Sequence, residues 1–500
     1  MTDVSTVNPT DAVDPLVLAI DIGTSSVRAL IYDSRGRAVL GWDAHRPYST
    51  TTTPDGGVEI DARLLLELVC GCIDDVVRLA EDASERIAAV ACDTFWHSVL
   101  GVAKTGEVVT PIYTWADTRS GPAARALQAR VDQDALHART GAVLHSSYVP
   151  AKLLWLSQIR PELVEHVGYW MSFGEYLYLQ FFGVRRVSIS MASGTGLLDQ
   201  GSCTWDSELL NELPIEAAQL SPIAEFSDVL TDLRAPYRQR WSALHHVPWF
   251  LPLGDGACNN VGSGGFCRDW AVAMIGTSAA LRIVYETSKV VIPRGLWSYR
   301  VDRRRVVQGG ALSEGGNVFA WLSHALRVPS EAEVESELLK MSPDGHGLTV
   351  LPFLAGERSP NWNVNARSAI VGMTLNTSPI QIVRACMEAI AYRIGAIYDI
   401  LVKTIGTPRG IIGSGAGLIR SPAWMQITAD VLGRPMAVSA VPEASSRGAA
   451  LLVLEAMGVL GDLSNAPAAL ATSHMPLDEN TRLYRAARER QNEVYKQLIG

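Results

Sequence analysis

The 500-residue sequence predicts an α/β protein made of two related domains that face each other. At about 150 residues per domain, the length fits two large domains or roughly three smaller ones. Strand-like runs come first and are followed by a helix and another strand, which is typical of an α/β domain. One strand–turn–strand pattern occurs in each half: Ile22-Gly23-Thr24-Ser25 matches Ile275-Gly276-Thr277-Ser278, 253 residues later.

The first half opens with a predicted β-meander. Branched apolar residues predict a buried strand at 16–20, and strands at 27–33 and 38–42 follow after turns at 21–26 and 34–37. Helical spacing of apolar residues predicts a helix over 61–80, and a strand is expected at 87–92. Residues 1–15 are polar and acidic, so we expect a flexible tail and no signal peptide.

The second half shows a similar succession of predicted strands and helices. Helices are predicted at 317–326, 330–341, 378–402, 422–432 and 446–457, and a charged helix at 477–498. We place the domain boundary close to residue 255. The predicted organisation is a tail at 1–15, an N-terminal domain at 16–255, a C-terminal domain at 256–470 and a C-terminal helix at 471–500.

Composition excludes several classes of protein. Hydrophobic residues make up 48% and charged residues 19%, which argues against broad disorder. The net charge of −9 argues against non-specific nucleic-acid binding, although small anionic ligands remain compatible. The longest apolar runs, such as 449–454, fall far short of the roughly 18 residues of a membrane span. The seven dispersed cysteines suggest free thiols in a reducing compartment, so we expect a cytoplasmic protein without a membrane partner.

The two Gly-Thr-Ser turns are candidate phosphate sites. Each follows a buried strand, and glycine lets backbone N–H groups approach an anion while the hydroxyl groups add donors. The first copy has Asp21 before its turn where the second has Met274, so Asp21 is the candidate carboxylate for a divalent metal. The alternative for Asp21 is a simple turn former. Arg28, on the following strand, either neutralises phosphate or is a solvated strand residue.

Asp255 is the candidate general base. It lies between two glycines after the apolar run 249–253, where a strand should end and a helix begin. A carboxylate there could accept the proton of a substrate hydroxyl, and the alternative is a helix N-cap. Other nucleotide and metal motifs are missing from the sequence: it has no G-x-x-x-x-G-K-[ST], no H-E-x-x-H, and GSGAG at 413–417 is not a dinucleotide fingerprint.

Taken in order, these segments resemble the FGGY family of carbohydrate kinases, in the actin-like ATPase superfamily, from about residue 16 to 460. The segments that carry the resemblance are AIDIGTSSVR at 19–28, YVPAKLLWL at 148–156, GDGA at 254–257, GTS at 276–278, SAIVGM at 368–373, QIVRACME at 381–388, GSGAG at 413–417 and SPAWMQ at 421–426.

The resemblance implies two ribonuclease-H-like domains around a central cleft and phosphorylation of a sugar or polyol hydroxyl by ATP with Mg²⁺. Asp255 would be the catalytic base, and Asp21 and Asp255 would organise Mg²⁺. The residues implied to bind the nucleotide are Gly23, Thr24, Ser25, Arg28, Gly276, Thr277, Gly316, Gly415 and Ala416.

Substrate identity is expected in the N-terminal domain. Trp96-His97-Ser98, Trp115-Ala116-Asp117-Thr118-Arg119, and the segments 308–317 and 356–363 resemble gluconokinases more than xylulokinases. The expected reaction is therefore D-gluconate to 6-phosphogluconate. The expected substrate-binding residues are Trp96, His97, Asp117 and Asp255.

Several alternatives stay open. Asp93, Phe95 and Trp96 depart from the gluconokinase pattern, which leaves a xylulokinase or another ketose or polyol kinase possible. Trp96 and His97 could also be ordinary core residues. The cations that could pair with a substrate carboxylate are His97, Arg119, Lys152 and Arg358. A different class, a non-catalytic actin-like ATPase regulator, is disfavoured by the presence of Asp255, and a homodimer is left open.

Overall fold

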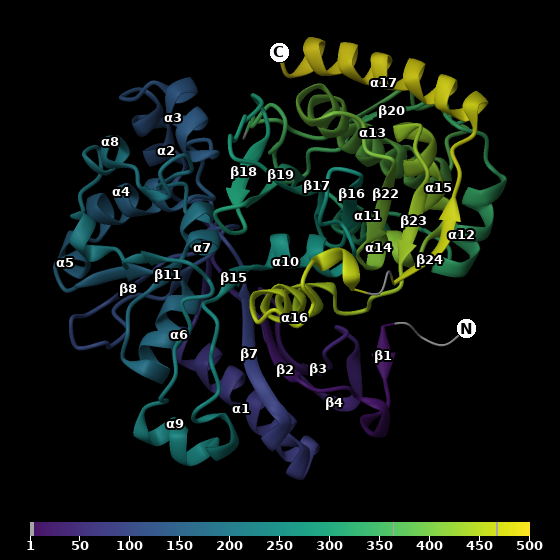
Figure 1. The fold of residues 1–500 in the computed structure, drawn as a ribbon. Helices are drawn as coiled ribbons and strands as arrows, with labels where there is room; N and C mark the ends of the chain where they lie inside the picture. Colours follow the sequence, from purple (N-terminus) through teal and green to yellow (C-terminus); the bar gives the residue numbers. More distant parts are fainter. Residues whose placement is uncertain (1–4, 364, 467–468) are drawn as a thin grey trace.

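The computed structural model describes residues 5–363, 365–466 and 469–500. The chain forms two α/β domains, and each is built on one large mixed sheet; in Figure 1 the N-terminal domain lies at the left and bottom and the C-terminal domain at the upper right. In each sheet an antiparallel hairpin is extended by parallel strands. The predicted repeat is therefore confirmed: β2 and β3 occupy the same place in the first sheet as β16 and β17 in the second.

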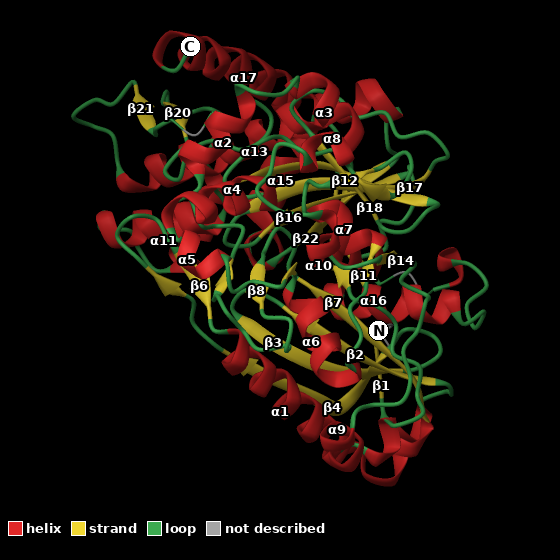
Figure 2. Cartoon of the chain, turned by 90° about the vertical axis from the view of Figure 1, so that its left-hand side faces the viewer, coloured by secondary structure: helices red, strands yellow, loops and turns green. Residues whose placement is uncertain are grey.

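The N-terminal sheet has apolar residues on both faces because helices cover both of them (Figure 2). Leu16, Leu18 and Ile20 pack towards α1 (Ala62–Ala80), whereas Val17 and Ala19 pack towards α16 (Ala444–Ala456). In spatial order the strands are β1 (Thr6–Val7), β4 (Ala38–Pro47), β3 (Ser26–Tyr32), β2 (Leu16–Ile22), β7 (Ile87–Thr94) and β15 (Leu253–Gly254).

The C-terminal sheet has seven strands, of which β22 and β23 run parallel to β16. In spatial order they are β18 (Trp297–Arg300), β19 (Arg305–Leu312), β17 (Ala279–Glu286), β16 (Trp270–Ile275), β22 (Gly410–Ser414), β23 (Met436–Ser439) and β24 (Leu470–His474).

The predicted long helices are confirmed with ends that differ by a few residues. Asp61 caps α1: its carboxylate accepts hydrogen bonds from the backbone N–H groups of Arg63 and Leu64, and aspartate is a favoured residue at this position. The C-terminal domain carries α11 (Gly316–Ala325), α12 (Glu331–Lys340), α13 (Pro379–Ile405), α14 (Ala416–Ile419), α15 (Pro422–Leu432) and α17 (Asp478–Leu498).

Shorter elements fill the rest of both domains. The helices are α2 (Gly121–Gln128), α3 (Gln133–Thr140), α4 (Val149–Ile159), α5 (Pro161–Val164), α6 (Phe173–Phe182), α7 (Ile189–Gly194), α8 (Ser207–Leu210) and α9 (Ala235–Arg240). The short strands are β5 (Thr51–Thr52), β6 (Val58–Ile60), β8 (Leu100–Val102), β9 (Ile112–Tyr113), β10 (Tyr169–Met171), β11 (Val187–Ser188), β12 (Leu198–Asp199), β13 (Thr204–Trp205), β14 (Ile223–Ala224), β20 (Thr349–Leu351) and β21 (Ala369–Val371).

Two helices join the domains at their centre (Figure 1). α10 (Asp255–Gly262) follows β15 directly and packs against α16, which also lies on β2 and β7 of the N-terminal sheet. The two helix backbones approach closely because glycines face each other. A Cβ on Gly448 would overlap the carbonyl oxygen of Cys258, and one on Gly262 would overlap that of Ala444. Larger residues would push the domains apart here.

The predicted ends of the chain need correction. Residues 1–4 of the expected tail lie outside the described residues, but Thr6–Val7 forms β1, which pairs in parallel with β4. Arg86 and Asp14 add an ion pair of 2.8 Å, so the segment is fixed to the domain. At the other end, residues up to His474 belong to β24, and α17 packs on α15 and β20 within the C-terminal domain.

The described part of the chain contains no helix that is both long and apolar enough to cross a membrane. All seven cysteines have free thiols, and all but Cys267 are buried, as expected.

Candidate active site

Both Gly-Thr-Ser turns line one cavity between the domains. The cavity has a volume of about 1510 Å³ and includes Thr24 and Ser25 on one wall and Thr277 and Ser278 on the other. Arg358 of the C-terminal domain lines it as well. The fold therefore brings the two predicted phosphate turns to the same space, although 253 residues separate them in sequence.

The second turn is held by the start of α11. The backbone N–H of Gly316 donates to the carbonyl of Gly276 at 2.7 Å, and that of Asn317 donates to the carbonyl of Thr277 at 3.1 Å. The N-terminus of a ten-residue helix thus lies at the turn, where its dipole favours an anion.

The third nucleotide segment joins the same place. Gly415 and Ala416 follow β22, which runs parallel to β16. Gly415 has a φ of +81°, and a Cβ there would lie 2.5 Å from the carbonyl oxygen of Ile275. Only glycine lets this loop approach the strand before the second phosphate turn so closely.

The first turn is held by its own hairpin. Gly23 N–H donates to the Ser26 carbonyl at 3.0 Å, and the Tyr48 hydroxyl donates to the Gly23 carbonyl at 2.5 Å. Arg28 lies between two carboxylates, 3.5 Å from Asp21 and 3.2 Å from Glu443 at the start of α16. Arg28 is therefore a link between the domains as well as a cation beside the turn.

Three carboxyl groups gather beside the first turn. Asp21 on β2 is in register with Asp93 on β7, and Asp93 is in turn beside Leu253 of β15, two residues before Asp255. Burial raises the pKa of Asp21, and burial together with the charges of Asp21 and Asp255 raises that of Asp93 still further. Burial raises the pKa of Asp255 to about 6, against the opposing charge of Arg282.

Asp255 is the first residue of α10 and not its N-cap, because Gly254 occupies that position without a side chain to cap it. Its Oδ1 accepts a hydrogen bond from the Gly256 backbone at 2.7 Å. The indole of Trp96 packs so close to Gly254 and Gly256 that any side chain at Gly254 would overlap it. Trp96 is 5% exposed, and its indole N–H donates to the Ser190 carbonyl. The indole is therefore held in place against the two glycines that flank Asp255.

His97 lies at the tip of the loop after β7, with a φ of +62°. Its Nδ1–H donates to the Gly194 carbonyl at 2.5 Å, which leaves Nε2 as an acceptor. Burial lowers the pKa of His97 to about 3, so the ring is neutral near pH 7. A neutral imidazole with a free acceptor suits a sugar hydroxyl.

Aromatic residues of both domains surround His97. The His97 ring is 4.8 Å from that of Tyr148 and 5.2 Å from that of Tyr299, which belongs to β18. The two tyrosine hydroxyls are hydrogen-bonded at 2.5 Å across the domain boundary. Trp362 lies beside Tyr148 on the same side.

Two expected ligands are used within the protein. Asp117 is 1% exposed, and its carboxylate accepts hydrogen bonds from the Arg119 guanidinium and the Val58 backbone, which hold its loop. Arg119 also pairs with Glu59 at 2.6 Å. Lys152 is fully buried and donates to the carbonyls of Ser146 and Ser147, which removes it as a carboxylate partner.

Two guanidinium groups remain for an anion. Arg282 on β17 and Arg358 have no carboxylate within 4 Å in the described residues, and the Nε of each is buried without a hydrogen-bond partner there. Both positive charges lower the pKa of His97, and the charge of Arg358 also lowers the pKa of Arg282. Arg358 lies over the Trp115 ring and donates one N–H to the Leu312 carbonyl at 2.5 Å. Glu314 is the carboxyl group whose charge acts on Arg358, and burial raises the pKa of Glu314 to about 7.

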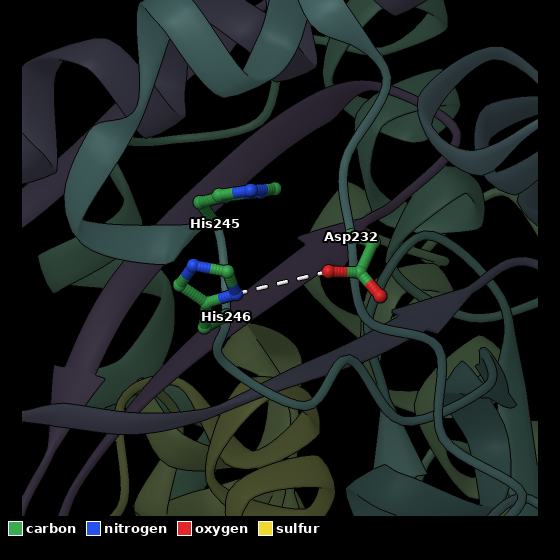
Figure 3. A group of neighbouring side chains, drawn as sticks. All are labelled: Asp232, His245 and His246. Atoms are coloured by element: carbon green, nitrogen blue, oxygen red, sulfur yellow. Dashed lines mark ion pairs between the residues drawn. The ribbon is translucent and has the colours of Figure 1, made fainter.

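Two groups of potential metal ligands lie elsewhere. Figure 3 shows Asp232, His245 and His246, with His246 Nδ1 3.7 Å from Asp232, on the loops around α9 and outside the cavity lining. In the second group, Asp344, His346 and Glu388, the Glu388 carboxylate is already bonded by protein donors. These donors are Arg384, His346, Tyr392 and Tyr484.

Sequence reasoning missed Arg282 and treated Asp93 only as a departure from the gluconokinase pattern on the wall of the expected pocket. Arg282 follows the second phosphate turn by only four residues, and an isolated basic residue in a strand gave no sign of its burial. The signal for Asp93 is an acidic residue at the end of an apolar strand, a position that is typical of functional sites in α/β proteins.

Comparison with known proteins decides the family. The model described as the FGGY family of carbohydrate kinases, N-terminal domain, matches residues 16–262, and that for the C-terminal domain matches residues 271–457. The chain belongs to the FGGY family of carbohydrate kinases. It is therefore a phosphotransferase with an alcohol group as acceptor, and it uses ATP with Mg²⁺.

Individual relatives are more distant. A gluconokinase of Bacillus subtilis is 24% identical over 488 residues, covering 94% of this chain and 93% of its own length. A gluconate kinase from Lactobacillus acidophilus superposes with a TM-score of 0.87 at 26% identity, covering 97% of this chain and 98% of its own. A xylulose kinase from the same organism gives 0.88 at 25% identity with the same coverage. The FGGY kinase thus has the expected two-domain, ribonuclease-H-like fold.

Proposed function

We propose that this kinase phosphorylates a sugar acid, D-gluconate, to 6-phosphogluconate. The observation that carries the proposal is the pair of guanidinium groups of Arg282 and Arg358 beside His97. Neither has a carboxylate within 4 Å in the described residues, although the charge of Asp255 acts on Arg282. Both side chains are half-buried and the Nε of each is fully buried, so their charges are poorly hydrated and suit an anionic acceptor. An arginine guanidinium also matches a carboxylate through two parallel hydrogen bonds. Similarity to gluconate kinases supports the same substrate.

In the proposed reaction the 6-hydroxyl of gluconate lies at Asp255 and its carboxylate lies at the arginines. Asp255 accepts the hydroxyl proton while the hydroxyl oxygen forms a bond to the γ-phosphorus of ATP. The bond from that phosphorus to the β–γ bridging oxygen breaks, and ADP leaves. The hydroxyl and backbone groups at Thr24 and Thr277, with the α11 N-terminus, are proposed to hold the phosphates in line.

The residues near the first turn fit the magnesium that the family uses. Asp21 and Asp255 offer carboxylate oxygens, the ligands that Mg²⁺ prefers, and the Asp21 side chain is only 8% exposed. Mg²⁺ bound with the nucleotide neutralises charge that develops on the phosphates. Arg28 keeps the Asp21 carboxylate in position.

The test compares acceptors that differ only at the proposed carboxylate. D-glucitol has a hydroxymethyl group where gluconate has its carboxylate, so it is the matched neutral acceptor. We expect kcat/KM to be higher for gluconate than for glucitol, xylulose or glycerol in a coupled ADP-release assay. Arg358→Gln should lower kcat/KM for gluconate by about 30-fold, the effect of removing one partner of a hydrogen-bonded charge pair that the bound substrate shields from water. It should change the glucitol rate little.

The second candidate is a ketose kinase, favoured by the likeness to a xylulose kinase. A kcat/KM for xylulose at least tenfold above that for gluconate would establish it and reject the sugar-acid proposal. The roles proposed for Asp255 and Asp21 would then still stand.

A further inference from the structure

His145 is a half-buried histidine that lines the cavity between the domains. Its Nδ1 accepts a hydrogen bond of 3.1 Å from the backbone N–H of Ser147. A backbone N–H can only donate, so Nδ1 carries no proton. Burial, together with the charges of Arg358 and Lys152, lowers the pKa of His145 to about 3, so the ring is neutral near pH 7. The single ring proton is therefore on Nε2, which is a hydrogen-bond donor.

The turn that carries His145 is held by the protein, whereas its Nε2 is not. The fully buried Lys152 donates to the carbonyls of Ser146 and Ser147 at 2.6 and 2.8 Å, and the Ser147 hydroxyl lies 3.1 Å from His145 Nδ1. Nε2 has no hydrogen-bond partner among the described residues. One nitrogen of the ring thus fixes the turn, and the other is left for a ligand in the cavity.

Ring contacts connect His145 to the proposed acceptor pocket. The ring centroid of His145 is 5.5 Å from that of Trp362, and Trp362 is 6.3 Å from Tyr148. The Tyr148 ring is in turn 4.8 Å from that of His97. A continuous row of aromatic side chains therefore runs from His97, the proposed partner of a sugar hydroxyl, to His145.

Positive charge surrounds the Nε2 donor. Arg358 lines the same cavity, and its charge is the strongest that acts on His145, followed by that of Lys152. No carboxylate is among the groups that shift the pKa of His145. A hydrogen bond to an ionised acceptor is roughly twice as strong as one to a neutral oxygen. These surroundings favour a carboxylate over a hydroxyl as the partner of His145.

We propose that His145 determines specificity by donating its Nε2–H to the carboxylate of the sugar acid, beside Arg358. The proposal rests on the proposed gluconate substrate. The two cavity histidines then have opposite roles: His97 offers an acceptor to a hydroxyl, and His145 offers a donor to the carboxylate. The difference follows from what each Nδ1 contacts, which is a carbonyl at His97 and an N–H at His145.

Two substitutions separate the donor from the structural role of the ring. His145→Asn can still accept a hydrogen bond from the backbone N–H two residues on, as asparagine does in turns, but it has no donor at the Nε2 position. His145→Gln is longer and reaches that position with an amide N–H. We expect His145→Asn to bind gluconate about tenfold or more weakly in calorimetry, and His145→Gln to recover most of the affinity.

The control is His166→Asn, the same substitution at an exposed histidine on the turn after α5, and it should bind gluconate as the unmodified protein does. Recovery by His145→Asn with a loss in His145→Gln would assign the ring a purely structural role and overturn the proposal. If His145→Asn does not fold, as judged by its melting temperature, His145→Leu takes its place as the variant without a donor.

Kinetics with two acceptors give a second readout. His145→Asn should raise KM for gluconate with little change in kcat, because the carboxylate takes no part in phosphoryl transfer. Its kcat/KM for D-glucitol should fall by about threefold or less, because the matching group there is neutral. ADP binding should be unchanged. Equal losses for both acceptors, or weaker ADP binding by a folded variant, would contradict a substrate carboxylate as the partner of His145.

The unmodified protein distinguishes this inference from the proposed function. If it binds gluconate and His145→Asn binds gluconate equally well, only the role of His145 is rejected. If the unmodified protein does not bind gluconate, the proposed function is rejected and the inference with it.

Discussion

Removing the guanidinium of Arg282 should move the acid limb of the activity profile to higher pH. Burial raises the pKa of Asp255 to about 6, and Arg282 is the strongest influence that lowers it. The guanidinium carbon lies 3.4 Å from the position that a Cβ would take on Gly256, so the charge is beside the turn. An opposite charge at such a distance lowers a carboxyl pKa by about 1–3, so Arg282→Gln should raise the pKa of Asp255 to about 7 or above.

The direction of the pH effect follows from the role of Asp255, because a base must be ionised to accept the hydroxyl proton. With a pKa of about 6, roughly 90% of Asp255 is ionised at pH 7 and roughly 10% at pH 5, so activity should fall about tenfold between them. In Arg282→Gln the same fall should occur between about pH 8 and pH 6.

The assay uses initial rates with both substrates well below KM, where the profile reports ionisations of the free enzyme. Arg358→Gln is the matched control, because Arg358 is a second half-buried guanidinium beside His97 that is not among the main influences on the pKa of Asp255. The kcat/KM of Arg358→Gln should be lower at every pH, and its fall on the acid side should still be centred near pH 6. A limb below pH 5 in the unmodified enzyme, or an unmoved limb in Arg282→Gln, would refute the reasoning.

Three further predictions concern the site and the contact between α10 and α16. Asp255→Asn should lower kcat by about 10²–10⁴ while calorimetry still detects ADP binding, and near-normal turnover would remove Asp255 as the base. Small-angle scattering should show a more compact particle with acceptor and a non-hydrolysable ATP analogue, because phosphate turns line both walls of the cavity; identical profiles at saturation would contradict closure. Gly448→Ala should destabilise the protein by about 1–3 kcal/mol in denaturant unfolding, since its Cβ overlaps the Cys258 carbonyl, whereas Gly121→Ala meets only a side-chain atom at 3.8 Å and should be near neutral.

Local patterns in the sequence were sufficient for the elements and for the family. The apolar run at 16–20 predicted β2, and the spacing of apolar residues predicted α1, α13 and α15, because burial imposes a period on a strand or helix whatever it packs against. The repeated Gly-Thr-Ser turn predicted the duplication. The short β1 was not predicted, because two residues are too few to show an alternation of apolar and polar side chains. The strand forms only by pairing with β4.

The chemistry of individual polar residues depended on distant neighbours. Sequence alone offered His97, Arg119, Lys152 and Arg358 as partners for a carboxylate, and the structure distinguished three of them. Arg119 pairs with Glu59, Lys152 donates to two backbone carbonyls, and Arg358 keeps an Nε without a hydrogen-bond partner in the described residues. Arg282 joins it from β17 of the same domain, and Asp93 meets Asp21 only through parallel register. The sequence determined which elements form, because that depends on near neighbours. The tertiary structure decided which charges are compensated, because electrostatic partners are set by distance in space.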